Sequence, residues 1–135
     1  DMRNIGIWID KEKTFILLIE DGKEAFSTIL SEVENYRPVG GSRSKTKWGP
    51  QEVVKGSSFL EREKHQLKNY FKKIAKKIAD ADAIAIFGPA DTNFKFNKEL
   101  TENYKLLAAK VKTVEKVDSM TNNQVKALIR DFFNK

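Results

Sequence analysis

The chain has 135 residues, of which 40% are hydrophobic and 33% charged, and its formal net charge is +6. This length and composition indicate one globular domain and exclude a disordered chain, while the positive charge favours a polyanionic partner. The absence of cysteine excludes disulfides, thiolate metal sites and a cysteine nucleophile, and it fits a cytoplasmic location, while no apolar run is long enough to span a membrane.

Three strands are predicted in the first third of the chain. Residues 5–9 alternate between isoleucine and other residues, which is typical of a half-buried strand. Residues 14–20 are almost continuously apolar, which indicates a strand covered on both faces. The pair Asp21 and Gly22 predicts a tight turn into a third strand at residues 25–30. We expect the three strands to form an antiparallel meander.

A long loop is predicted at residues 35–57, where glycine, proline and serine are frequent and no apolar periodicity is visible. Loops of this length inside a compact domain are uncommon without a function. Between residues 37 and 51 there is no acid, and Trp48 is available to stack on an unpaired base. The same stretch holds four cations that would neutralise phosphates: Arg37, Arg43, Lys45 and Lys47. We interpret the loop as a nucleic-acid contact; the alternative is a solubilising loop with the tryptophan folded onto the core.

A long basic helix is predicted after the loop. Its apolar residues recur at helical spacing: Leu67, Tyr70, Phe71, Ile74, Ala75 and Ile78. Residues 62–77 hold seven cations and one acid, Glu63, which is too few acids for helix-stabilising pairs. Lys64, Lys68 and Lys72 recur at every fourth residue and share one stripe. We interpret this face as a phosphate-binding surface in preference to a plain solvated face.

The last part of the chain alternates strands and helices. A buried strand at residues 83–87 follows the long helix and is therefore expected to be parallel to its neighbour. A helix at residues 99–109 and a strand at residues 111–117, with irregular spacing of its valines, come next. Thr121 and Gln124 form the capping-box pattern of a final helix.

The order of these elements predicts the fold class. Three hairpin-linked strands followed by helix, strand, helix, strand and helix predict a single α/β domain over residues 1–135. By analogy this order is ribonuclease H-like: a mixed five-stranded sheet whose first three strands are antiparallel, with helices packed on it.

Other residues that could carry chemistry are few. Asp10, Glu61 or Glu63, and Asp91 occupy places where a ribonuclease H-like fold can bind divalent ions, so a metal-dependent nuclease is one alternative. Each is also an ordinary residue of a turn or of a helix start, and we expect no metal site and no cofactor. His65 is the only histidine and is expected on the helix surface. The sequence contains no Walker A motif, no nucleophile elbow and no dinucleotide fingerprint.

Several motifs carry a resemblance to known proteins. Residues 40–42 read Gly-Gly-Ser within the basic loop, and residues 62–70 read Arg-Glu-Lys-His-Gln-Leu-Lys-Asn-Tyr in the helix that follows. Residues 84–91 read Ile-Ala-Ile-Phe-Gly-Pro-Ala-Asp, and Phe94 and Lys95 come shortly after. In these motifs and in its order of elements, the chain resembles the central domain of the archaeal and eukaryotic class-1 release factors and of the related rescue factor Pelota.

The chain is also similar to small bacterial relatives of that domain. Those proteins open with a strand like Gly-Ile-Trp-Ile-Asp, here residues 6–10. They share a Gly-Gly-Ser-Arg-Ser loop and a Gly-Pro-Gln step, here residues 40–44 and 49–51. The resemblance covers nearly the whole chain and implies one release-factor-central-domain-like domain.

The resemblance also implies candidates for catalysis. In release factors a Gly-Gly-Gln loop promotes the attack of water on the peptidyl-tRNA ester. Gly40 and Gly41 match the two glycines, but Ser42 stands at the position of the glutamine, and Gln51 is an alternative further along the loop. Whether this chain hydrolyses peptidyl-tRNA stays open at this point.

The function that the resemblance implies is translation-associated binding of ribosomal RNA or tRNA, with ribosome rescue or peptidyl-tRNA hydrolysis as candidate roles. DNA and membranes are not expected as partners. The predicted RNA-binding residues are Arg37, Arg43, Lys45, Lys47, Trp48, Lys64, Lys68 and Lys72. A second alternative, besides the nuclease, is a non-catalytic adaptor that binds an acidic protein through the same basic face.

Overall fold

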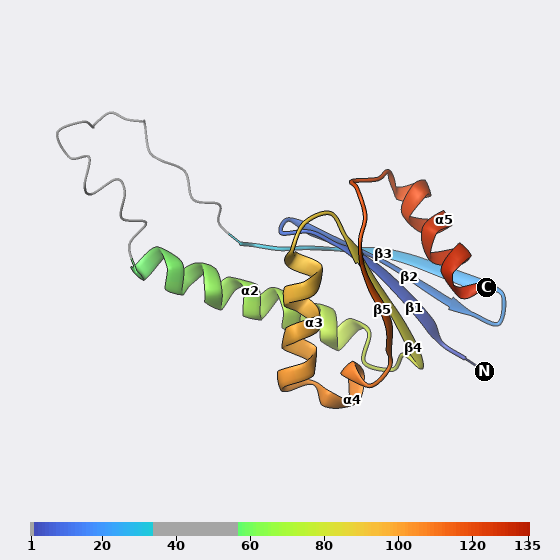
Figure 1. Cartoon of the computed structure of the whole chain (residues 1–135), viewed down its shortest axis with the longest axis horizontal. Helices are drawn as coiled ribbons and strands as arrows, with labels where there is room; N and C mark the ends of the chain where they lie inside the picture. The colour runs from blue at the N-terminus through green and yellow to red at the C-terminus, as the bar shows by residue number, and fades with distance from the viewer. Residues whose placement is uncertain (1, 34–56) are drawn as a thin grey trace.

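The structure is a computed structural model that describes residues 2–33 and 57–135. One five-stranded sheet has the strand order β3-β2-β1-β4-β5 (Figure 1). Its strands are β1 (Asn4–Ile9), β2 (Lys13–Glu20), β3 (Lys23–Leu30), β4 (Ala83–Gly88) and β5 (Val111–Lys116). The helices in the described part are α2 (Ser57–Lys77), α3 (Thr92–Asn103), α4 (Lys105–Ala108) and α5 (Asn122–Phe133).

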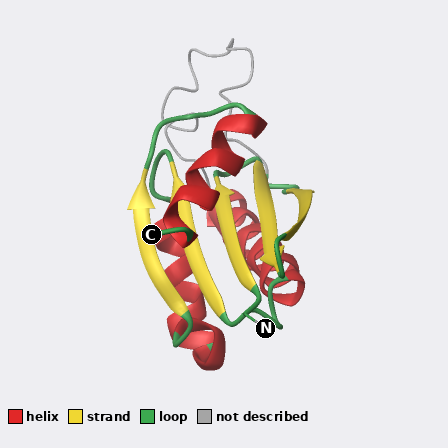
Figure 2. Ribbon diagram, turned by 90° about the vertical axis from the view of Figure 1, so that its right-hand side faces the viewer, coloured by secondary structure: helices red, strands yellow, loops and turns green. Residues whose placement is uncertain are grey.

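The sheet is mixed. Strands β1, β2 and β3 pair antiparallel, while β4 is parallel to both β1 and β5. Helix α5 lies on one face, and α2, α3 and α4 lie on the other (Figure 2). The predicted α/β class, the mixed five-stranded sheet and the antiparallel arrangement of the first three strands are confirmed. None of the described helices is both long and apolar enough to cross a membrane.

Strand β1 was expected to be half-buried, and this prediction is wrong. Residues 5–9 are all buried, because β1 lies at the centre of the sheet with helices on both faces. Its isoleucines pack in the cluster below α2 and α3, while Trp8 packs in the cluster below α5. A Cβ atom at Gly6 would lie 2.3 Å from Cγ2 of Ile129, so the missing side chain lets α5 approach the sheet closely.

Strand β2 is covered over only half of its length. Residues 14–17 are buried, whereas residues 18–20 are partly exposed, so the prediction of cover on both faces holds only for the first half. The turn that follows is the predicted one: Asp21 and Gly22 have positive φ angles of 56° and 75°. Two successive positive φ angles are typical of the tight turns that match the twist of a hairpin.

The helix predicted at residues 99–109 is also wrong in its bounds. Helix α3 begins at Thr92 and ends at Asn103, and α4 is a separate short helix. The break falls at Tyr104, whose φ of −137° and ψ of 63° are not helical. Phe96 and Leu100 are four residues apart on α3, and both are fully buried, so they anchor this helix on the core.

The irregular spacing of the valines in β5 has a structural cause. Ile84 pairs with Val111 but Ala85 pairs with Thr113, so the register shifts by one residue between them. The extra residue lets Val111 and Val114 pack in the same cluster although they are three positions apart. At α5 the predicted capping box is confirmed, with the Thr121 side chain and the Gln124 side chain each binding the other's backbone N–H.

Candidate nucleic-acid interface

Helix α2 is strongly two-sided. One side is buried in the core through Tyr70, Phe71, Ile74, Ala75 and Ile78, the last of which follows the helix. The opposite side is solvent-exposed and carries six lysines, here called the basic face of α2: Lys64, Lys68, Lys72, Lys73, Lys76 and Lys77. The predicted separation into an apolar side and a basic side is therefore present. The basic side includes Lys64, Lys68 and Lys72, the three helix residues that the sequence predicted to bind RNA.

The lysines of the basic face are not neutralised by the described residues. None of the six forms an ion pair with a carboxylate of the described part of the chain. The helix's Glu63 is engaged elsewhere, because the Nζ of Lys11 lies 2.5 Å from its Oε2. The positive potential of this face is therefore directed to solvent, where an anionic ligand would find it.

Besides the Lys11–Glu63 pair, two hydrogen bonds of Tyr70 hold α2 against the turn after β1 and the start of β2. The buried hydroxyl of Tyr70 donates a hydrogen bond to the backbone carbonyl of Asp10 at 3.0 Å. The hydroxyl of Thr14, which is also buried, lies 2.6 Å from the same phenol oxygen and donates to it. Burial raises the pKa of the Tyr70 phenol above its ordinary value, so the group stays neutral. These contacts fix the orientation in which α2 presents its lysines.

The lysines of the basic face line different hollows. Lys64 and Lys68 line a hollow of about 240 Å³ together with Glu99 and Glu102 of α3. Lys72 instead lines a larger, mainly apolar groove beside α4. The three predicted lysines therefore share one helix surface but do not converge on one pocket. Lys73 lines a further hollow with Glu32, and Lys77 lines one with Asp80, whereas the groove lined by Lys72 and Lys76 contains no acid.

The carboxylates considered for a metal site all have other partners or stand apart. The Asp10 carboxylate accepts hydrogen bonds from the backbone N–H groups of Glu12 and Lys13, both at 2.8 Å, which is an ordinary turn role. Asp91 is exposed before the first turn of α3 and lies 3.5 Å from Lys95. Glu61 is exposed on α2. Among the described residues, no group of three or more histidines, aspartates or glutamates could hold a metal ion.

The loop residues singled out in the sequence lie outside the described residues. They are Arg37, Gly40, Gly41, Ser42, Arg43, Lys45, Lys47, Trp48 and Gln51. Their roles in RNA binding or catalysis remain predictions. His65 is exposed on α2, as expected. Lys110 is a basic residue near α2 that sequence reasoning missed, because it follows α4 and is far from α2 along the chain.

Together, the fold and the basic face define an α/β domain with a cationic helix on one side of its sheet. Solved structures with this fold include Pelota from Archaeoglobus fulgidus, with 12% identity and a TM-score of 0.58, and Pelota from Thermoplasma acidophilum, with 15% and 0.55. The archaeal translation termination factor aRF1 follows, with 10% identity and a TM-score of 0.52. No family model matches the chain, and no curated protein matches its sequence.

These matches cover almost all of the chain but only a part of each larger protein. They include 96% of this chain for either Pelota and 98% for aRF1. The same matches span 31%, 32% and 38% of those proteins, so the chain is about a third of their length. The predicted likeness to Pelota and to a class-1 release factor is confirmed at the level of the fold.

Proposed function

We propose that this chain is a translation-associated RNA-binding domain that engages ribosomal RNA or tRNA through the basic face of α2. The observation that carries the proposal is a row of six exposed lysines without a carboxylate partner among the described residues. From Lys64 to Lys77 these lysines span about 20 Å of helix axis, at 1.5 Å per residue. A surface of this length contacts several phosphates at once, and each contact releases counterions from the RNA.

The choice of RNA from the translation apparatus is supported by the fold. The neighbour aRF1 is a translation termination factor, and this chain shares the fold of about a third of it. The sequence resemblance to the central domain of release factors and Pelota also favours ribosomal RNA or tRNA as the partner. Ribosome rescue is the role that suits a domain without a glutamine at position 42.

The proposal stops at binding. The candidates for hydrolysis of the peptidyl-tRNA ester, Gly40, Gly41, Ser42 and Gln51, lie outside the described residues, and their role stays a prediction. Two carboxylates of the described residues already have structural roles. Asp10 accepts a hydrogen bond from the backbone N–H of Glu12, and Glu63 is ion-paired with Lys11. A turnover assay with peptidyl-tRNA on ribosomes is worth running once binding is established.

The test compares two triple variants of the full chain by co-sedimentation with ribosomes over a range of salt concentrations. Six engaged phosphates would give a log–log salt slope of about −4 on single-stranded RNA. Changing Lys64, Lys68 and Lys73 to alanine removes three contacts and makes the slope shallower by about 2. We expect the affinity of the same variant for tRNA to fall as well.

The matched control changes three exposed lysines elsewhere, Lys23, Lys98 and Lys112, to alanine and alters the net charge equally. We expect it to retain most of the binding, because these lysines lie on β3, α3 and β5 and leave all six lysines of α2 in place. Equal losses in the two variants would reduce the effect to net charge and contradict the proposal. A further variant, with Arg43, Lys45 and Lys47 changed to alanine, tests the loop; if it alone abolishes binding, α2 is not the interface.

A further inference from the structure

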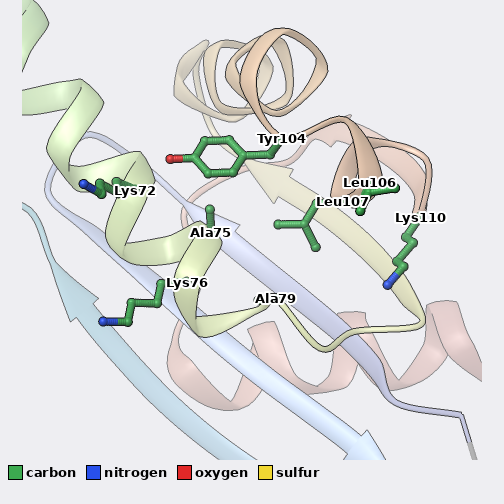
Figure 3. A pocket seen from close by; sticks show the side chains of 8 residues that line it. All are labelled: Lys72, Ala75, Lys76, Ala79, Tyr104, Leu106, Leu107 and Lys110. Carbon is green, nitrogen blue, oxygen red and sulfur yellow. The ribbon is translucent and has the colours of Figure 1, made fainter.

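An open groove lies between the end of α2 and α4, on the helix-rich face of the sheet. Its volume is about 570 Å³. Figure 3 shows Tyr104 and Leu107 directed toward Ala75 of α2, with Lys72 and Lys76 on one side of this apolar centre and Lys110 on the other. The lining of the groove, here called the α4 groove, consists of Lys72, Ala75, Lys76, Ala79, Tyr104, Leu106, Leu107 and Lys110.

The helix break at Tyr104 lies at the groove, and α4 begins directly after it. Leu107 turns into the core and is only 7% exposed, so its neighbour Leu106 points away from it and is 84% exposed. Leu106 is therefore a large apolar side chain exposed at the edge of the groove. The three charged groups that line the groove are all cationic, and none of the lining residues is an acid.

We propose that the α4 groove binds an acidic segment of a partner protein. One or two apolar side chains of that segment would contact Tyr104 in the centre of the groove and cover Leu106 at its edge. Its carboxylates would lie beside Lys72, Lys76 and Lys110 at the margins. An apolar anchor surrounded by complementary charge is the arrangement by which amphipathic helices bind grooves in other proteins.

The lining of the groove disfavours two other occupants. An unpaired RNA base stacks on aromatic rings, and the groove offers one such ring, Tyr104, whereas the rest of its apolar centre consists of alanine and leucine. A second copy of this chain in a two-fold dimer would bring its own lysines against Lys72, Lys76 and Lys110, and like charges oppose such an interface. An acidic protein segment satisfies both the apolar centre and the basic margin.

This site is distinct from the RNA-binding proposal, and only Lys72 and Lys76 belong to both surfaces. The two proposals can therefore fail separately. Leu106 is not part of the basic face of α2, and its replacement leaves every lysine in place. Ribosome co-sedimentation of the Leu106→Ala variant is expected to match that of the wild type.

The experiment titrates the isotopically labelled full chain with a synthetic acidic helical peptide. The peptide carries leucine at positions i, i+3, i+4 and i+7 and glutamate on its other faces, and a matched peptide has lysine in place of every glutamate. We expect the acidic peptide to change the amide chemical shifts of residues 72–79 and 104–110. Fluorescence anisotropy with the labelled peptide measures the affinity.

Variants of exposed residues separate the groove from general charge. Leu106→Ala is expected to weaken binding about tenfold and Leu106→Glu to abolish it, because both remove the exposed apolar contact at the edge of the groove and the glutamate also repels an acidic segment. Lys76→Glu should weaken binding by a similar factor. The matched control is Lys68→Glu, which changes the net charge equally on the same helix but lies outside the groove, and its affinity should stay close to that of the wild type.

Several results would overturn the proposal. They are no binding of the acidic peptide at millimolar concentration, shift changes away from the groove, and equal binding of the lysine peptide. Self-association that Leu106→Glu abolishes would assign the groove to a second copy. Flotation with anionic phosphatidylserine vesicles that the same variant abolishes would assign it to a membrane surface.

Discussion

Helices α2 and α5 cover opposite faces of one sheet, and both carry basic residues, but they use them differently. On α5 the guanidinium of Arg130 donates two hydrogen bonds to the carboxylate of Glu24, at 2.6 and 2.7 Å. Lys126 lies over the ring of Phe26, 4.7 Å from its centroid. The basic residues of α5 therefore bind β3, whereas the lysines of α2 have no carboxylate partner among the described residues.

The difference shows that positive charge alone does not define a ligand surface. What matters is whether the neighbouring elements supply acids or aromatic rings. Strand β3 supplies Glu24 and Phe26 to α5 across the sheet's edge. Beside Lys72 and Lys76 of α2, by contrast, the chain around α4 supplies leucine, tyrosine and a further lysine.

The largest effect is expected from breaking the attachment of α5. The Cβ atom of Gly6→Ala would lie 2.3 to 2.9 Å from three side-chain carbons of Ile129, so α5 must move away from β1. We expect a loss of about 3 kcal/mol in the free energy of unfolding, at the upper end for an overpacked core. Urea unfolding of the variant measures the change.

The double variant Gly6→Ala with Ile129→Ala tests that cause. Removing the clashing carbons should make the double variant more stable than the sum of the single changes predicts. Strict additivity would show that the close approach of α5 to β1 is not what requires glycine. Ribosome binding through α2 should survive in either variant at temperatures where it remains folded.

An intermediate effect is expected from loosening α2. Tyr70→Phe removes the hydrogen bond to the Asp10 carbonyl and leaves the buried Thr14 hydroxyl without its partner. The expected loss is about 1–2 kcal/mol in the free energy of unfolding. Thr14→Val added to Tyr70→Phe should recover part of it, and an unchanged stability of the single variant would contradict the role given to this phenol.

The same phenol predicts a dependence on alkaline pH. Burial raises the pKa of Tyr70 in the folded state, whereas in the unfolded state the phenol ionises near its ordinary value of 10.0. Its contribution to stability is complete below pH 10 and is lost as the pH rises further, with a slope of at most about 1.4 kcal/mol per pH unit. Tyr70→Phe should lack this component. The stabilities of the wild type and the variant should therefore converge as the pH rises from about 9 to about 11, across the ordinary pKa of the phenol.

The smallest effect is expected from the ion pair of α5. The hydrogen bond from Arg130 lowers the pKa of Glu24, so the pair contributes to stability above the ordinary pKa of glutamate and loses this contribution as the pH falls through the lowered value. Because the pair is exposed, Arg130→Ala should reduce stability less than Tyr70→Phe. The difference from wild type should shrink in acid and in high salt. Molar salt shortens the Debye length to about 3 Å. A stability difference between wild type and Arg130→Ala that persists there or at about pH 2 would come from packing and not from the ion pair.

Local patterns in the sequence were sufficient for most of the elements. The turn at Asp21 and Gly22, the capping box at Thr121 and Gln124, and the apolar side of α2 each depend on residues close together in the chain. Periodicity also separated the lysines from the core side of α2. These features are determined by backbone geometry and by spacing, which act before any distant contact forms.

The bounds of α3 and the burial of β1 were not predictable in this way. The break at Tyr104 occurs where Leu107 must turn into the core, which depends on the position of α2. The burial of β1 depends on its central place between β2 and β4 and on the two helix layers. Alternation in a sequence shows which residues share a face, but not whether a helix covers that face.

By itself, the sequence determined the order of elements, the α/β class and the presence of a helix with a basic side, because these follow from local propensity and periodicity. Only the tertiary structure decided which charges are neutralised. Lys11 reaches Glu63 and Arg130 reaches Glu24 across long separations in the chain, whereas Lys72, Lys76 and Lys110 gather around an apolar groove. Electrostatic interactions depend on distance in space, and the folded chain sets that distance.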